Sequence, residues 1–392
     1  MDTKLSSSRD TLIINSGFAL LWSLTTIIVF PSVINSSLIA ALFCLATYKY
    51  WTKEFARLLR ETKLVWPGIL IFVAIGVVGS ELPEKSAKGA YDILRCIALF
   101  YFITPFLRKT SNEALLKSLH YFLLFASFLS FAAVIWIQLS EQTILIRESQ
   151  TGHLVFSGYH HFVNSVAVIF ILAFCLTISK SLSWHWTLPI FLLLFYCLLF
   201  SYSRGNWLAI FFVVTFLISY QKKVLFYSWF FLVILFYLSY YYIFYLFPCP
   251  ETSCNITIFN RQHIYRNTLE LIETAPFFGF GISVFKIISE IKEAGLKVVM
   301  PHNIFLESLY SVGIIGTASL IGSFSVFIIK SGWLKKTILP ERPLPIHILI
   351  SISLLIYLAI RGTFDLKLAD SPTFGIIAIS MAFLYSRKPN CS

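Results

Sequence analysis

The chain has 392 residues, of which 57% are hydrophobic, 17% aromatic and only 13% charged, and its mean hydropathy is +0.78. Soluble domains carry charge on about a quarter of their residues, so this composition excludes a soluble domain, and the contents of Gly, Pro and Cys exclude collagen-like, disordered and disulfide-rich classes. The net charge of +12 would suggest nucleic-acid binding in a soluble protein, but in a membrane protein it indicates cytoplasmic loops rich in Lys and Arg. We therefore expect an all-α polytopic membrane protein without a nucleic-acid partner.

Twelve apolar runs alternate with charged or Pro- and Gly-containing connections, and most are long enough for a transmembrane helix. Their approximate limits are 12–30, 33–48, 64–79, 90–107, 118–139, 160–179, 185–200, 205–220, 224–247, 303–329, 346–361 and 372–386. The second, third and seventh runs are short and could be tilted or re-entrant. Lys and Arg are more frequent in the connections on the side of the membrane that holds the N-terminus, which indicates that this side is the cytoplasm. An even number of helices then places both ends of the chain inside the cell. The sequence predicts one membrane domain, 1–392, with about 12 transmembrane helices.

Two charged residues, Asp92 and Arg95, interrupt the fourth run at a spacing of three. Residues three apart lie on the same face of a helix, and an ion pair makes both charges tolerable in a membrane. The spacing predicts an internal ion pair, although the two residues could also line a site.

The outer segment 248–302 is long and holds many of the outer cations. Asn260 is a candidate N-cap for a helix in which Ile264 and Leu271 share an apolar face, and Pro276 ends that helix. This pattern predicts an amphipathic helix on the outer membrane surface, within one large outer loop.

Two of the seven cysteines, Cys249 and Cys254, lie in the same loop, in C-P-E-T-S-C. An oxidising outer compartment would allow them to pair, while a free pair or a strained bridge also stays open for so short a loop. The other cysteines are explained as small apolar filler. No Cys or His pairs recur at zinc-ligand spacing, so we expect no metal site.

Arg204 stands in S-Y-S-R-G-N-W, at the outer start of the run 205–220, where Ser203 is a candidate N-cap. A cation in the first turn of a helix opposes the helix dipole, so the placement favours an anionic ligand shared by the guanidinium and the helix amides. The alternative is an arginine that reaches the lipid phosphates from the interface.

A second arginine, Arg261, opens the predicted surface helix, with Tyr265 one turn later and Arg266 on another face. The sequence A-P-F-F-G-F-G follows and returns the chain toward the membrane. Gly279 and Gly281 fit a flexible turn better than a phosphate-binding loop, because neither a strand nor a Lys-Ser/Thr pair accompanies them.

His302 lies in M-P-H-N-I-F-L-E, where Pro301 can set the first turn of the following helix. A helix N-terminus disfavours the imidazolium, and a neutral imidazole can accept a proton, so His302 is a candidate general base. A histidine merely hydrogen-bonded at the interface is the alternative. Glu307, and Asp365 in the outer segment R-G-T-F-D-L-K-L-A-D, could orient His302 or a substrate hydroxyl, or could be solvated charges.

Taken in order, S-R-G-N-W, R-x-x-x-Y followed by P-F-F-G-F-G, and P-H-N-I-F-L-E-S-L-Y-S-V-G-I-I-G resemble the O-antigen ligase family. That family also contains O-antigen polymerases and protein O-oligosaccharyltransferases, and the resemblance covers about half the chain. It implies a multi-helix glycosyltransferase fold of the C type, free of metal and cofactor, in the bacterial inner membrane with a large periplasmic loop.

The resemblance also implies roles for single residues. Arg204 and Arg261 match the family arginines that hold the diphosphate of an undecaprenyl-diphosphate-linked glycan, and Arg266 is a second candidate for the loop cation. His302 matches the family histidine at the acceptor hydroxyl. Tyr265 stands where the family usually has Trp.

The implied function is an inverting transfer of the glycan to a sugar hydroxyl of lipid A–core on the periplasmic face. Asp365 matches only the general presence of an acidic residue in the last periplasmic loop. The expected absence of a large C-terminal soluble domain disfavours the protein-glycosylating relatives, whereas a polymerase shares the motifs and stays an alternative. A lipid-linked glycan transporter or flippase is a third possibility. It would need polar residues near the bilayer midplane and an internal repeat, whereas most ionisable groups here lie at the outer interface and we find no repeat.

Overall fold

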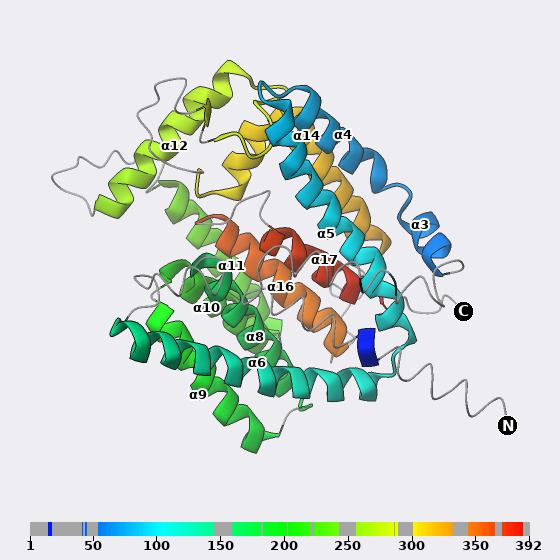
Figure 1. Cartoon of the computed structure of the whole chain (residues 1–392), viewed down its shortest axis with the longest axis vertical. Coiled ribbons are helices and arrows are strands. Elements are labelled where there is room, and N and C mark those ends of the chain that lie inside the picture. The colour runs from blue at the N-terminus through cyan, green and yellow to red at the C-terminus, as the bar shows by residue number, and fades with distance from the viewer. Residues whose placement is uncertain are drawn as a thin grey trace.

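The computed structural model describes residues 15–17, 41, 44, 54–144, 159–181, 183–201, 203–220, 223–242, 256–285, 287–288, 301–331, 344–364 and 371–386. Over these ranges the regular elements are helices (Figure 1). They are α3 (Ala56–Thr62), α4 (Trp66–Val78), α5 (Pro83–Lys109), α6 (Asn112–Glu141), α8 (Tyr159–Ile178), α9 (Trp184–Ser201), α10 (Arg204–Ser219), α11 (Lys223–Tyr241), α12 (Ile256–Thr274), α14 (Ile304–Lys330), α16 (Ile346–Gly362) and α17 (Ser371–Tyr385).

Each predicted run from 64–79 onward coincides with a helix, which confirms the all-helical prediction for the described part of the chain. The runs 12–30 and 33–48 fall almost entirely outside the described residues. By length and apolar composition α5, α6 and α14 are candidate membrane spans, and α3 with α4, bent by 79° at their junction, form a fourth. The remaining apolar helices are shorter. The described residues therefore hold three or four candidate spans plus shorter apolar helices, although ten of the twelve predicted runs lie in this part of the chain.

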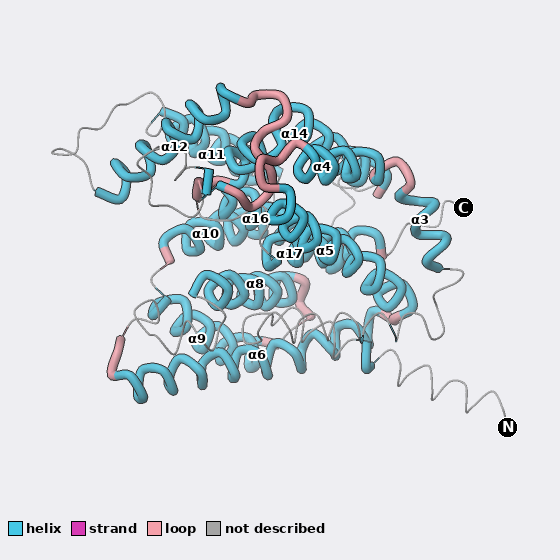
Figure 2. Tube along the Cα trace, turned by 45° about the horizontal axis from the view of Figure 1, so that its top comes forward, coloured by secondary structure: helices cyan, strands magenta, loops and turns pink. Residues whose placement is uncertain are grey.

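The helices form two groups with α16 and α17 between them (Figure 1, Figure 2). On one side α4 packs against α14 and α5, and on the other α8 packs against α9 and α6. The α16 helix contacts α17, α10 and α8, and most of its side chains are buried. It is the central helix of the described structure.

Small polar residues lie at the contacts of α16. The buried Ser351 hydroxyl donates to the Ser380 carbonyl of α17 (2.6 Å), and the Cys175 thiol of α8 donates to the Ser353 hydroxyl (3.5 Å). Small residues let helix backbones approach closely, and their hydroxyls pair internally, which is how apolar helices pack without a hydrophobic driving force. The burial of Cys175 fits its expected role as filler, whereas Cys44 is exposed.

The α14 helix is interrupted at Gly313, whose φ of 62° lies in the left-handed region. The loop that follows α12 fills the interruption with backbone hydrogen bonds. These bonds are Phe280 N to Tyr310 O (3.0 Å), Gly281 N to Ser311 O (2.8 Å), Ile314 N to Pro276 O (2.8 Å) and Ile315 N to Phe277 O (3.3 Å). Backbone groups freed by a helix break must be paired again when they are buried, and the loop performs this pairing.

Gly279 and Gly281 form a turn, as the sequence predicts, but the turn is held firmly in place. A Cβ atom at Gly279 would lie 2.5 Å from the Tyr310 carbonyl oxygen, so only glycine allows the loop to approach α14. On the other side of the loop, the Ser80 hydroxyl donates to the Phe280 carbonyl (3.0 Å). The loop thus joins α12, α14 and the connection between α4 and α5.

Candidate functional site

Arg204 is the first residue of α10 and is exposed. Ser203 occupies the N-cap position, but its hydroxyl accepts a hydrogen bond from the Asn206 side-chain amide (2.9 Å) and caps no backbone amide. Ser203 is therefore the N-cap residue by position, as predicted, but its hydroxyl pairs with the buried Asn206 side chain and not with a backbone amide. The exposed cation still lies at a helix N-terminus, as the sequence indicates.

The position of Arg261 in its helix differs from the prediction. The helix α12 begins at Ile256, so Asn260 lies within the helix and does not cap it, and Arg261 lies in the second turn. Arg261 is partly exposed and Arg266 is exposed. The first-turn prediction failed because the residues before Asn260 continue the helix without a stop signal.

The amphipathic character of α12 is confirmed: Ile264 and Leu271 are buried and Glu270 is exposed. The buried face belongs to a hydrophobic cluster with Tyr240 of α11 and Tyr310 of α14. The apolar face is therefore covered by protein, whereas the sequence interpretation placed it against lipid. Packing on α14 supplies the apolar surface that the membrane was expected to provide.

His302 immediately precedes the N-cap of α14 and is half-buried. Asn303 is the cap, since its side-chain oxygen accepts hydrogen bonds from the amides of Phe305 (2.9 Å) and Leu306 (3.2 Å). The predicted role of Pro301 in the first turn is therefore wrong. His302 has a φ of 56°, which non-glycine residues rarely adopt and which is common at functional positions.

Glu307 lies in the first turn of α14, on the same helix start as His302, and only 5% of it is exposed. The positive end of the helix dipole favours a carboxylate there.

The end of α16 lies against both α10 and α14. Arg361, in the last turn of α16, is only 1% exposed, and a Cβ atom at Gly205 would lie 2.5 Å from its Nη1 atom. A Cβ atom at Gly362 would lie 2.7 Å from Cγ2 of Ile304, the first residue of α14. The two glycines thus allow close contact of α16 with the helix starts that carry Arg204 and His302.

Thr363, the residue that follows α16, bonds to the loop helix α12. The hydroxyl oxygens of Tyr240 and Tyr265 lie 2.9 Å and 3.3 Å from the Thr363 carbonyl oxygen, which accepts a hydrogen bond from this pair, and the two hydroxyl oxygens are 2.8 Å apart. Tyr265 is fully buried. The segment 361–364, here called the α16 end, therefore contacts all three motif-bearing segments.

Sequence reasoning did not single out Arg361, because R-G-T-F-D was assigned to an outer loop. The structure places Arg361 in α16, with its Nε donating to the Asn164 side-chain oxygen of α8 (3.4 Å). A signal was present: Tyr357 precedes Arg361 by four residues in an otherwise apolar run, so the two share a face.

Three predicted residues, Asp365, Cys249 and Cys254, lie outside the described residues. The Asp92–Arg95 ion pair is confirmed, with 3.1 Å between Oδ1 and Nη2. Among the described residues, no three His, Cys, Asp or Glu side chains are grouped as metal ligands.

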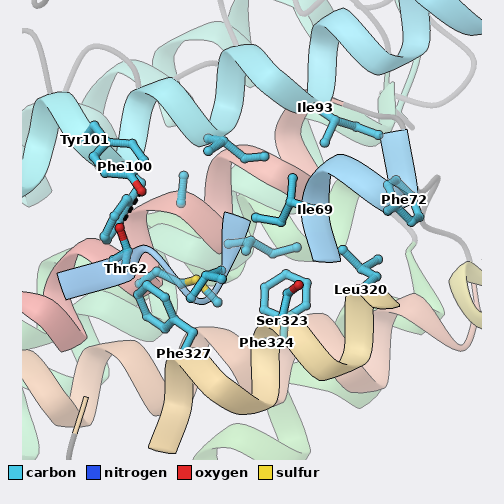
Figure 3. A pocket seen from close by; sticks show the side chains of 15 residues that line it. Thr62, Ile69, Phe72, Ile93, Phe100, Tyr101, Leu320, Ser323, Phe324 and Phe327 are labelled. Atoms are coloured by element: carbon cyan, nitrogen blue, oxygen red, sulfur yellow. Dashed lines mark hydrogen bonds between the residues drawn. The ribbon is translucent and has the colours of Figure 1, made fainter. Parts of the chain in front are cut away.

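A partly open apolar cavity of about 620 Å³ lies between α4, α5, α14 and α17 (Figure 3). Phe72, Ile93 and Leu320 line one part of it, and Thr62 and Tyr101, whose hydroxyls are 2.6 Å apart, line another. None of the predicted site residues is among its lining residues, so the α16 end is the candidate site.

Residues 189–321 match a family model described as O-antigen ligase. The match begins in α9 and ends in the second half of α14, and it includes Arg204, Arg261 and His302. No curated protein matches the chain. The matched segment contains the three motifs that meet at the α16 end. The chain is therefore similar to the O-antigen ligase family over residues 189–321.

Proposed function

We propose that the protein transfers a glycan from undecaprenyl diphosphate to a sugar hydroxyl of lipid A–core, on the periplasmic face of the inner membrane. The observation that carries this proposal is the convergence of three family motifs on the α16 end. An O-antigen polymerase differs only in its acceptor, another lipid-linked glycan. A transporter lacks comparable support, because the segments that carry the cations and the candidate base all contact the α16 end.

On the donor side, Arg204 and Arg261 bind the diphosphate. Arginine forms paired hydrogen bonds with phosphate oxygens, and the amides at the start of α10 add partial positive charge. Charge that develops on the leaving diphosphate is neutralised by the two guanidinium groups, so the reaction proceeds without a metal ion. Arg266 is exposed on α12, the helix that also carries Arg261, and is the second candidate for the loop cation.

On the acceptor side, His302 accepts the proton of the attacking hydroxyl. The hydroxyl oxygen forms a bond to the anomeric carbon while the bond from that carbon to the phosphate oxygen breaks, and its electron pair leaves with the diphosphate. Direct displacement inverts the anomeric centre. Glu307 or Asp365 orients His302 or the hydroxyl, whereas buried Tyr265 acts by holding α12 in place.

Deletion of the gene, followed by gel analysis of lipopolysaccharide, tests the proposal. A lost ladder with accumulated lipid-linked polymer is the expected result. A band of core plus one repeat unit would identify a polymerase, and donor accumulated on the cytoplasmic face would identify a flippase. Transfer by the purified protein in excess EDTA tests metal independence, and loss of activity there would contradict it.

A further inference from the structure

We propose that Arg361 is a positioning residue that holds the first turn of α10 so that Arg204 faces the donor. This inference rests on the proposed function, because it assigns Arg361 a task through Arg204. Arg361 is 1% exposed and belongs to α16, outside the segment that matches the family model. Such burial keeps Arg361 from binding a substrate directly. Its neighbour Gly205 belongs to the motif S-R-G-N-W, directly after Arg204.

The residues that follow Arg204 contact Arg361 or share a hydrogen-bond acceptor with it. Nη1 of Arg361 occupies the space that a side chain at Gly205 would need. Nε donates to the Asn164 oxygen (3.4 Å), and that oxygen also accepts from the Asn206 amide (3.3 Å).

Tyr357, one turn before Arg361, completes the network by donating to the Asn206 oxygen (2.5 Å). Asn206 in turn donates to the Ser203 hydroxyl (2.9 Å). Ser203 and Asn206 are buried, whereas Arg204 between them is exposed. The network therefore holds both flanks of Arg204 and leaves its side chain facing outward.

Arginine suits this position better than lysine. A planar guanidinium can contact Gly205 and donate to Asn164 at the same time, whereas an ammonium group cannot make both contacts in that geometry. Networks of buried hydrogen bonds are strongly coupled, so a small displacement of the guanidinium moves the start of α10.

The test measures the binding of undecaprenyl diphosphate to the purified full-length protein in lipid nanodiscs. We expect Arg361→Lys and Gly205→Ala each to weaken binding about tenfold, as is typical for residues coupled in one network. In the Arg204→Ala background, Arg361→Lys should cause no further loss, because the residue it positions is absent. Arg108→Lys is the matched control, since Arg108 is another largely buried arginine, paired with Glu61 (2.7 Å), and it should bind normally.

Unchanged binding by both single variants would overturn the proposal, and so would a further tenfold loss in the Arg204→Ala background. If Arg361→Lys fails to fold, Gly205→Ala carries the same comparison, since its added methyl group displaces the same guanidinium. Wild-type protein that does not bind the lipid would refute the proposed function and this inference together. Normal wild-type binding with unaffected variants would refute only the positioning role.

Discussion

At the scale of single residues, exposure separates the groups that can meet a substrate from those that build the site. Arg204 and Arg266 are exposed, and Arg261 and His302 are partly exposed, so each can reach a ligand. Tyr265 is fully buried and bonded to the Thr363 carbonyl, so its role is to anchor the loop helix. Aromatic character at this position is therefore explained by packing and needs no contact with the glycan.

The first prediction concerns the donor arginines. Arg204→Ala and Arg261→Ala should each lower donor binding about 10- to 100-fold, because a charged hydrogen bond contributes about 1.5–3 kcal/mol. Lys at either position should restore part of the binding, since it keeps the charge and loses the paired contact. Titration of each variant with the lipid-linked donor measures the effect. Arg57→Ala, on α3, is the control, and normal donor use by either site variant would remove that arginine from the site.

The second prediction concerns His302. His302→Ala should slow the chemical step by about 10²–10⁴-fold, the usual contribution of a general base, while donor binding persists. Single-turnover transfer by the purified variant, measured beside donor binding, separates the two effects. Near-normal turnover would show that the left-handed backbone at His302 serves folding alone.

The third prediction is that Cys249 and Cys254 form a disulfide. The proposal rests on the oxidising periplasm and on their separation of five residues. Freshly isolated, non-reduced membranes should show no labelling of either residue with a thiol reagent, and labelling after reduction. Labelling of both before reduction would refute the bond.

At the scale of elements, the interrupted helix α14 and the loop docked in it set the relation between α12 and the start of α14. Gly279 and Gly313 are both in the left-handed region, and both face backbone at close range. Four hydrogen bonds cross between the two segments in this stretch. The loop after the Arg261 helix is thereby attached to the middle of α14, the helix that begins just after His302.

The fourth prediction is that Gly313→Ala will destabilise the protein. A non-glycine residue at this φ costs about 1–3 kcal/mol, and the added methyl group also meets the Phe277 carbonyl. The melting temperature of the detergent-solubilised protein should fall, and transfer should fall with it. Gly322→Ala is the control in the same helix, because a Cβ atom there meets nothing within 4 Å. Equal melting temperatures for the two variants would show that the interruption is not important for stability.

At the scale of the whole molecule, the buried α16 helix lies between two groups of helices, and its C-terminal end carries the candidate site. Several of the apolar helices packed around it are shorter than a full membrane span. From the positive-inside pattern of the sequence we predict that this end of α16 faces the periplasm.

The fifth prediction is about this orientation. In a protein otherwise free of cysteine, Glu273→Cys on α12 should react with a membrane-impermeant maleimide added to spheroplasts. Glu113→Cys at the start of α6 should react only after the inner membrane is opened. Both glutamates are exposed, so accessibility within the protein does not favour either one. The reverse labelling pattern would invert the topology and place the candidate site in the cytoplasm.

The sequence by itself determined the helical class, the positions of ten helices and the amphipathic face of α12. These features depend on local composition and on the periodicity of apolar residues, which a single chain displays directly. The Asp92–Arg95 pair was predictable for the same reason, because its partners are one helical turn apart.

Only the tertiary structure decided how the motifs meet. Arg361 lies against Gly205 although the two are far apart in the chain, and Tyr265 is buried because the Thr363 carbonyl and Tyr240 lie beside it. The interruption at Gly313 is likewise stable only because a distant loop supplies its hydrogen bonds. Such contacts join segments whose separation carries no periodic signal, so they follow from packing and not from local pattern.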